Sequence, residues 1–260
     1  MKNTALITGA SGGIGAEFAR YHAARGGDLV IVARSEDKLN ALKSELEHAY
    51  DVQVLVIAAD LAEPDSAQEI FATTESAGIQ VDILINNAGY GGHGKFYQRD
   101  LSGEQAMMQV NVISLVSLTH LYLQGMVDRN SGKILHVASS AAFVPGPLMA
   151  VYYATKSFVA SFSQAIAQEL SDTNVTSTVL CPGPVATGFV EASDLKGVPA
   201  LEHAASADSV ASCGYEAMLN GDLVKINSPG IAFLVTWILP LLPRKMILKL
   251  GQKTMEKRQA

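Results

Sequence analysis

Short apolar runs alternate along the chain with longer stretches in which apolar residues recur every three to four positions. Near-continuous runs rich in Val, Ile and Leu are typical of strands covered on both faces of a parallel sheet. The longer stretches have the periodicity of amphipathic helices. The predicted strands are residues 4–8, 28–33, 52–58, 82–85, 133–137, 175–181 and 223–226. The predicted helices are residues 13–25, 35–50, 63–77, 102–127, 151–170 and 206–220. This order predicts an α/β fold with a single doubly wound parallel sheet of about seven strands and helices on both faces.

The alternation ends near residue 228. Residues 231–243 read IAFLVTWILPLLP and a basic segment follows them. The apolar run is too short for a membrane span and is broken by Pro240. We expect a catalytic domain over residues 1–228 and an apolar, basic extension packed on it over 229–260. Two interpretations of the extension stay open. It either caps an apolar pocket or contacts another subunit, or it lies on an anionic membrane, which Trp237 and the basic run would suit.

Composition narrows the function classes. The 260 residues include 19 Lys and Arg against 25 Asp and Glu, a net charge of −6, which argues against a nucleic-acid partner. The only cysteines, Cys181 and Cys213, form no disulfide framework or zinc motif, and no His, Cys, Asp or Glu cluster has metal-ligand spacing. We therefore expect no bound metal. We also expect a cytoplasmic protein, and the alternative is a protein attached to the surface of a membrane.

A glycine-rich loop directly follows the first predicted strand. Residues 8–15 read TGASGGIG, and the first predicted helix begins inside them. Glycines at such a place allow a tight turn and a close approach of a pyrophosphate, and the positive end of the helix favours the negative charge. The strand–loop–helix context favours a nucleotide site over a tight turn without a ligand.

The loop resembles the TGxxxGxG pattern of the short-chain dehydrogenase/reductase superfamily. Three further matches follow in the family's order: Asp60 after the third strand, NNAG at 86–89 after the fourth, and YxxxK from Tyr152 to Lys156. Together the matches cover most of the chain. The resemblance implies a Rossmann-like domain that binds a nicotinamide cofactor and carries out hydride transfer.

The choice between NADP(H) and NAD(H) is a matter of charge. The second strand ends at Ala33 and is followed by Arg34 and Ser35, with no carboxylate before Glu36. An acidic residue at this place binds the ribose hydroxyl of NAD, whereas an Arg accommodates the phosphate of NADP. We expect NADP(H), with Arg34 and Ser35 as contacts; the alternative is that Arg34 is a solvated residue opening a helix.

The resemblance extends the cofactor site. Pro182 and Gly183 match a PG motif that cradles the nicotinamide, and Val185 and Thr187 match residues that contact its carboxamide side. The expected cofactor-binding residues are Gly9, Ser11, Gly12, Gly13, Ile14, Gly15, Arg34, Ser35, Asp60, Leu61, Asn87, Ala88, Gly89, Tyr152, Lys156, Pro182, Gly183, Val185 and Thr187.

Tyr152 and Lys156 share one face of a predicted helix, since they are four residues apart. A phenol has an unperturbed pKa near 10, and a nearby ammonium lowers that pKa toward the working range. The pair therefore suits a proton donor and acceptor. Tyr153 is three residues before Lys156, and the motif selects Tyr152 instead.

The resemblance completes the catalytic set with Ser139 and Asn111. Ser139 lies 13 residues before Tyr152 and would orient the substrate oxygen, while the adjacent Ser140 leaves a second choice open. Asn111 matches a residue that, in relatives, bends its helix and holds a water linking the lysine to solvent. The other interpretation of Asn111 is a buried amide bonded to backbone.

Three segments correspond to the family's substrate-binding loops: residues 89–96, 141–151 and 188–201. They are apolar and aromatic with few charges, which favours a hydrophobic ketone, aldehyde or secondary alcohol. The expected pocket residues are Tyr90, His93, Phe96, Phe143, Leu148, Met149, Phe189 and Val190.

The function predicted from these features is an NADP(H)-dependent short-chain oxidoreductase. A 3-oxoacyl (ACP or CoA) reductase of lipid metabolism is the narrower alternative, and a non-catalytic nucleotide-binding regulator is the alternative from another class. The full set of four catalytic-type residues argues against the regulator. By resemblance we also expect a homodimer or homotetramer formed through the helices at 102–127 and 151–170.

Overall fold

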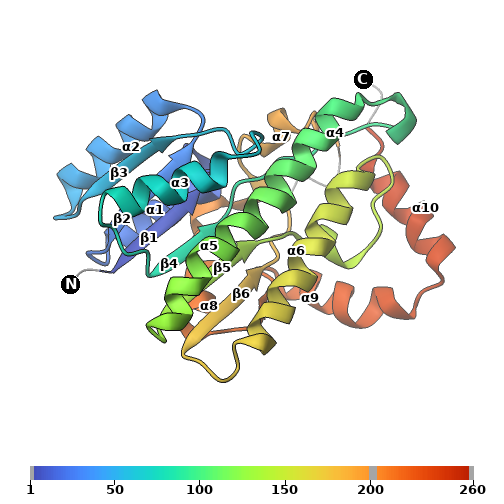
Figure 1. Ribbon diagram of the computed structural model, residues 1–260. Coiled ribbons are helices and arrows are strands. Elements are labelled where there is room, and N and C mark those ends of the chain that lie inside the picture. Colours follow the sequence, from blue (N-terminus) through green and yellow to red (C-terminus); the bar gives the residue numbers. More distant parts are fainter. Residues whose placement is uncertain (1–2, 199–203, 258–260) are drawn as a thin grey trace.

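Parallel strands form the centre of the protein. The computed structural model describes residues 3–198 and 204–257. One seven-stranded sheet has the order β3-β2-β1-β4-β5-β6-β9, and all its pairs are parallel (Figure 1). Its strands are β1 (Thr4–Thr8), β2 (Asp28–Ala33), β3 (Val54–Ala58), β4 (Ile83–Asn86), β5 (Gly132–Val137), β6 (Val175–Leu180) and β9 (Val224–Lys225). The predicted fold class is confirmed.

Helices cover both faces of this sheet (Figure 1). Alternate residues of β1 point to opposite layers: Ile7 packs with Phe18 of α1 in one apolar cluster, and Leu6 packs with Leu118 of α5 in the other. The α-helices are α1 (Gly13–Ala23), α2 (Glu36–Ala49), α3 (Ser66–Ser76), α4 (Leu101–Met108), α5 (Leu115–Asp128), α6 (Ala150–Glu169), α7 (Phe189–Ala192), α8 (Ala207–Asn220), α9 (Pro229–Phe233) and α10 (Arg244–Met255).

Shorter elements lie between them. A two-stranded parallel sheet pairs β7 (Val185–Ala186) with β8 (Ala205–Ser206). The 3₁₀ turns are η1 (Phe96–Gln98), η3 (Ser140–Phe143) and η6 (Leu239–Leu241), and the π-helical turns are η2 (Gln109–Ser114) and η5 (Leu234–Ile238).

The helix predicted over 102–127 is confirmed as one helical stretch over Leu101–Asp128, with a π-helical turn inside it. The π turn η2 separates α4 from α5, because its backbone closes a wider hydrogen-bonded ring than an α-helix does. The whole stretch Leu101–Asp128 has the length and apolar composition of a membrane span. Its residues Leu118, Tyr122 and Met126 nevertheless pack against the sheet, as in a core helix of a soluble domain.

The strand order reverses between β1 and β4. The chain runs from β1 outward to β2 and β3, then returns to β4 on the other side of β1, where Ile7 pairs with Ile85. A crevice forms outside the carboxyl ends of parallel strands at such a switch point. The loops that follow β1, β4, β5 and β6 therefore meet at one edge of the sheet.

Replacing Leu84 with Ala tests the position of the core. Leu84 is fully buried in β4 between β1 and β5. Leu84→Ala should lower the free energy of unfolding by about 3 kcal/mol, because the buried side chain leaves a cavity. Leu101→Ala, at a residue that is 59% exposed, should lower it by less than about 0.5 kcal/mol. Urea unfolding measures both, and equal losses in the two variants would contradict the burial assigned here.

Candidate active site

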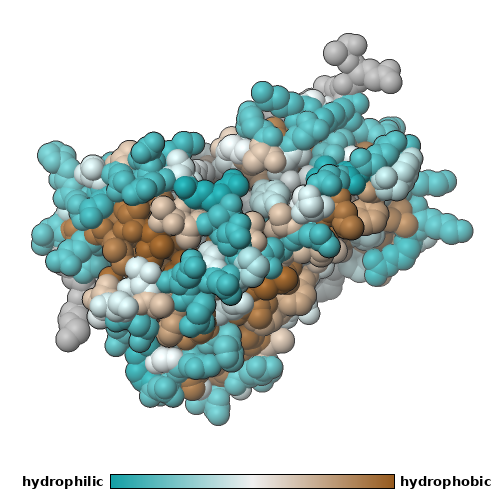
Figure 2. Space-filling model, turned by 45° about the horizontal axis from the view of Figure 1, so that its top comes forward, coloured by the Kyte–Doolittle hydropathy of each residue, from teal (hydrophilic) through white to brown (hydrophobic). Residues whose placement is uncertain are grey.

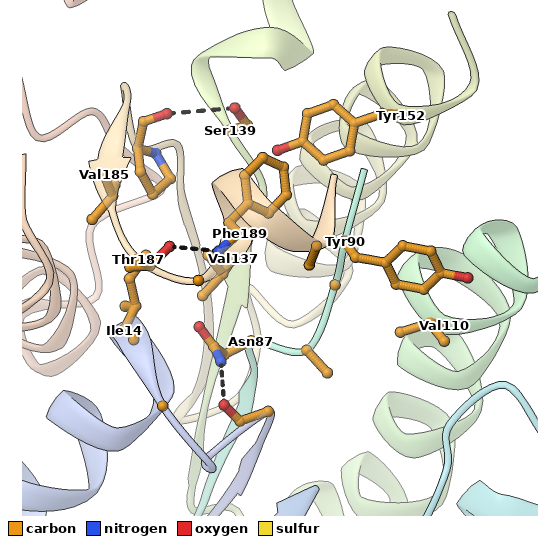
Figure 3. A pocket seen from close by; sticks show the side chains of 18 of the residues that line it. Ile14, Asn87, Tyr90, Val110, Val137, Ser139, Tyr152, Val185, Thr187 and Phe189 are labelled. Carbon is orange, nitrogen blue, oxygen red and sulfur yellow. Dashed lines mark hydrogen bonds between the residues drawn. The ribbon is translucent and has the colours of Figure 1, made fainter. Parts of the chain in front are cut away.

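A cavity of about 620 Å³ lies at the carboxyl edge of the sheet. The glycine loop after β1 lines one end, and Tyr152 with several apolar side chains lines the other. Figure 3 shows Ile14, Asn87, Val185 and Thr187 toward the first end. The cavity is therefore long, with a polar backbone-lined part and an apolar part.

The glycine loop has a conformation that side chains would obstruct. Gly9 and Gly13 have φ values of +68° and +55°. A Cβ at Gly15 would lie 2.3 Å from the Gly9 carbonyl oxygen and 2.6 Å from Asn87 Nδ2. Gly9 and Gly13 line the cavity, whereas Gly15 does not and instead lets the start of α1 pack against the loop. The loop thus brings backbone and the positive end of α1 to the cavity.

Thr8 and Asn87 join the ends of β1 and β4. The Thr8 hydroxyl accepts hydrogen bonds from the backbone N–H groups of Asn87 and Ala88, each at 3.0 Å. The Asn87 side-chain amide donates to the Thr8 carbonyl oxygen at 2.9 Å and to that of Gly9 at 3.4 Å. These bonds fix the glycine loop relative to β4.

Basic side chains lie at the end of the cavity beside β2. Arg34, Ser35 and Asp60 all line it, and the Arg34 guanidinium is 4.0 Å from the Asp60 carboxylate with its side chain 76% exposed. Lys38, in the first turn of α2 and four residues after Arg34, also lines the cavity. Sequence reasoning missed Lys38; its spacing of four residues from Arg34 was the available signal.

Ser139 and Tyr152 meet near the middle of the cavity. In Figure 3 the Tyr152 hydroxyl is directed toward Ser139, whose Oγ donates to the Pro182 carbonyl oxygen at 3.5 Å. Ser139 Oγ accepts from the Ala141 N–H at 3.1 Å, so η3 holds the serine in place. Ser140, which opens η3, also lines the cavity, but the Ser139 hydroxyl is the one that bears on Tyr152.

Burial dominates the titration of Tyr152 and Lys156. Burial raises the pKa of Tyr152 well above its usual value, while the hydrogen bond with Ser139 lowers it. Burial has the opposite effect on the amine and lowers the pKa of Lys156 to about 8. Sequence reasoning expected the ammonium to bring the phenol pKa down. In this structure burial gives the net upward shift, while Lys156 Nζ lies 5.9 Å from the Tyr152 ring centre and donates to the Val137 carbonyl oxygen at 2.9 Å, so its effect on the phenolate stays a prediction.

Asn111 lies inside the π turn η2 and is fully buried. Its amide donates to the Tyr90 carbonyl oxygen at 2.9 Å and to the Thr155 hydroxyl at 3.1 Å, and its Oδ1 accepts from the Tyr90 N–H at 3.1 Å. A Cβ at Gly89 would lie 3.0 Å from this Oδ1 and 3.2 Å from Lys156 Nζ, so the two groups converge. Asn111 does not line the cavity; its proton-relay role stays a prediction.

Most predicted cofactor residues line the cavity. Gly15 is the exception, as described above. The residues brought together there are Gly9, Ser11, Gly12, Gly13, Ile14, Arg34, Ser35, Asp60, Leu61, Asn87, Ala88, Gly89, Tyr152, Lys156, Pro182, Gly183, Val185 and Thr187.

The predicted substrate pocket needs correction. Only Tyr90, Met149 and Phe189 of the eight expected residues line the cavity. The other five lie elsewhere, because membership of a loop does not fix the direction in which each side chain points. Phe96 is 57% exposed on η1, and Phe143 lines a second cavity. Val190 packs against the apolar cluster that includes Tyr152, Leu148 has a φ of +67°, and the His93 ring bonds to the Met255 carbonyl oxygen. The predicted substrate segment 188–201 also includes residues 199–201, which lie outside the described part of the chain.

Residues that are remote from one another in sequence form the apolar part of the cavity instead. Tyr153, Leu195, Val198 and Met255 line the apolar part of the cavity near Tyr152. The Phe189 ring lies 5.3 Å from the Tyr152 ring, between centres. Because Met255 belongs to the last helix, only the folded chain reveals that it is part of the pocket.

Comparison with known proteins agrees with this geometry. Residues 3–196 match the short chain dehydrogenase family. A very-long-chain 3-oxoacyl-CoA reductase of Macaca fascicularis is 32% identical over 255 residues, which are 95% of this chain and 78% of that protein. The Homo sapiens protein of the same name is 35% identical over 187 residues, 70% of this chain and 59% of that protein, so the match leaves part of each relative uncovered.

A solved structure is similar over nearly the whole fold. A short-chain dehydrogenase from Sphingobium yanoikuyae in complex with NADPH superposes with a TM-score of 0.83 at 31% identity, covering 89% of this chain and 90% of that one. The chain belongs to the short-chain dehydrogenase family and is an oxidoreductase of the alcohol–carbonyl couple.

Proposed function

We propose that this protein uses NADP(H) to interconvert an apolar ketone or aldehyde and the corresponding alcohol. The observation that carries the proposal is the position of Ser139 and Tyr152, which lie within hydrogen-bonding reach of each other and line the cavity that also holds the glycine loop and the apolar side chains. A carbonyl oxygen held by both hydroxyls would leave the rest of its molecule among apolar side chains.

The residues present fit a dinucleotide. The two positive-φ glycines and the start of α1 offer backbone and a positive helix end for phosphates, and Pro182, Val185 and Thr187 also line the cavity. When bound, the nicotinamide supplies or accepts the hydride.

The chain's own residues manage the oxygen and its proton. Tyr152 is neutral at physiological pH, since burial raises its pKa, and it therefore has a proton to donate to a substrate oxygen. Ser139 is held by η3 to hydrogen-bond the same oxygen. Lys156, fixed by the Val137 carbonyl, would stabilise the phenolate that remains. Asn111 would hold a water that links Lys156 to solvent, through which the proton of Tyr152 would be replaced.

Two positive charges support NADP(H) over NAD(H). Arg34 and Lys38 both line the cavity beside β2, and the Arg34 guanidinium is held only loosely by Asp60 at 4.0 Å. A free guanidinium fork matches a phosphate. Lys38 adds a second cation at a place where the sequence suggested one cation, Arg34, and the Ser35 hydroxyl.

A 3-oxoacyl thioester reductase is the narrower candidate. The relatives from Macaca fascicularis and Homo sapiens bear that name, and the apolar wall formed by Met149, Phe189, Leu195, Val198 and Met255 would suit an acyl chain. We also propose a homodimer or homotetramer, since Ile113 on η2 and Phe158 on α6 are exposed large hydrophobic residues on the two helical segments expected to pair.

Tyr152→Phe should lower kcat by roughly 10² to 10⁴-fold, because the ring keeps its shape but loses the proton. The matched control is Tyr153→Phe, which should stay within about tenfold of wild type. NADPH oxidation with aliphatic, aryl and steroid ketones and 3-oxoacyl thioesters measures turnover. Retained turnover in Tyr152→Phe would overturn the assignment of the proton donor.

Ser139→Ala should reduce kcat by roughly 100-fold or more, since it removes a hydrogen-bond donor to the substrate oxygen. Ser140→Ala is the neighbouring control and should cost less than about tenfold. If the two losses were reversed, Ser140 would be the residue that orients the oxygen.

Arg34→Gln should raise KM for NADPH by about tenfold and leave KM for NADH nearly unchanged, because only the phosphate-bearing cofactor loses a charged partner. Lys43→Gln is the control, because Lys43 lies on the following helix α2 and is paired with Glu47 away from the cavity. A wild-type preference for NADH would contradict the cofactor proposal.

A further inference from the structure

Charge is unevenly distributed along the chain. Residues 229–260 contain six Lys and Arg and one Glu, whereas residues 1–228 contain 13 Lys and Arg and 24 Asp and Glu. Residues 229–243 carry no charge at all. An apolar segment and a basic segment thus follow each other on a protein that is otherwise acidic.

The apolar segment leaves large side chains uncovered. Phe233, Trp237 and Leu241 are 60%, 66% and 83% exposed, and they follow one another at intervals of four residues. Val235 is the buried residue between them. Soluble surfaces rarely present so many neighbouring large apolar groups without a partner. On the face seen in Figure 2, hydrophilic residues predominate and hydrophobic ones are gathered in separate patches.

Helix α10 adds a row of cations. Lys245, Lys249 and Lys253 are exposed at intervals of four residues, so they share one side of the helix. Within residues 3–198 and 204–257 none of them forms an ion pair. Ile247 is buried on the opposite side. The helix is therefore anchored by one side and presents unpaired ammonium groups on the other.

The inner side of this segment belongs to the active-site region. Met255 lines the main cavity, and its carbonyl oxygen is 2.7 Å from His93 Nε2. A second cavity of about 540 Å³ lies between α10 and the loop before α6, and Tyr153 lines both cavities. Whatever the outer side of the segment touches is therefore close to the apolar end of the substrate site.

We propose that the outer side of residues 229–257 docks on the surface of an anionic lipid bilayer. Phe233, Trp237 and Leu241 would enter the interfacial region, and the lysines of α10 would meet the anionic head groups. Charge complementarity favours this occupant over a second copy, because a two-fold contact would bring the same lysines of both copies together. This proposal rests on the proposed function in one respect: if the substrate is apolar, the membrane would be the source from which it reaches the cavity.

Trp237 is the only tryptophan, so its fluorescence reports directly on this surface. The full-length protein should co-sediment with vesicles containing phosphatidylglycerol, and the emission should move to shorter wavelength and become protected from an aqueous quencher. Binding should weaken as salt is added. Vesicles of phosphatidylcholine alone should bind much more weakly.

A triple variant Lys245→Gln/Lys249→Gln/Lys253→Gln should lose about 100-fold in affinity for the anionic vesicles, since each lysine near such a surface contributes about fivefold. The control Lys43→Gln/Lys196→Gln/Lys225→Gln removes the same charge from lysines paired with acidic side chains elsewhere and should bind like wild type. Both variants should keep wild-type turnover of a soluble ketone without vesicles, which separates this proposal from the enzymatic one.

Two results would overturn the proposal. One is equal vesicle binding by the two triple variants or no binding by wild type. The other is a Trp237 emission that is already shifted without lipid and depends on protein concentration, with a matching dimer in analytical ultracentrifugation; a second copy would then occupy the surface.

Discussion

The hydrogen bonds between Thr8 and Asn87 are the contact on which the rest of the site depends. They tie the end of β1 to the end of β4 at the point where the strand order reverses. Gly15 lets Asn87 Nδ2 and the Gly9 carbonyl approach, since a Cβ there would collide with both. The glycine loop and the loop after β4 are thus held as one unit, and the cavity forms along it.

Burial has the second decisive effect, and it acts on Tyr152 and Lys156 in opposite directions. Loss of water disfavours the phenolate of one and the ammonium of the other, which raises the first pKa and lowers the second. Each charged form therefore depends on a specific partner. Ser139 is the partner of the Tyr152 phenolate, and the Val137 carbonyl is the partner of the Lys156 ammonium. Residues on three different elements set the proton chemistry together.

The glycine-lined half of the cavity was predictable because it is local. A strand, a glycine loop and a helix follow one another in sequence, and backbone geometry fixes where they lie. The apolar half was not, since His93 bonds to Met255 across 162 residues and Ser193 accepts a hydrogen bond from the Gly91 N–H across 102. Periodicity predicted the long helix at 102–127 but could not show the π turn, since the interruption changes hydrogen-bond spacing and leaves the apolar pattern nearly intact.

The C-terminal segment, residues 229–257, connects the apolar end of the cavity with the exposed apolar and basic surface. Its inner side supplies Met255 to the cavity, and Lys257 pairs with Asp194 just after α7 at 2.8 Å. In Figure 1 the segment runs along the opposite end of the molecule from α2, where the Arg34 side of the cavity lies. A change around Met255 therefore acts on the apolar end of the cavity, at a distance from Arg34. The wall of the cavity can vary there while the glycine loop, Ser139 and Tyr152, which lie on other elements, keep their positions.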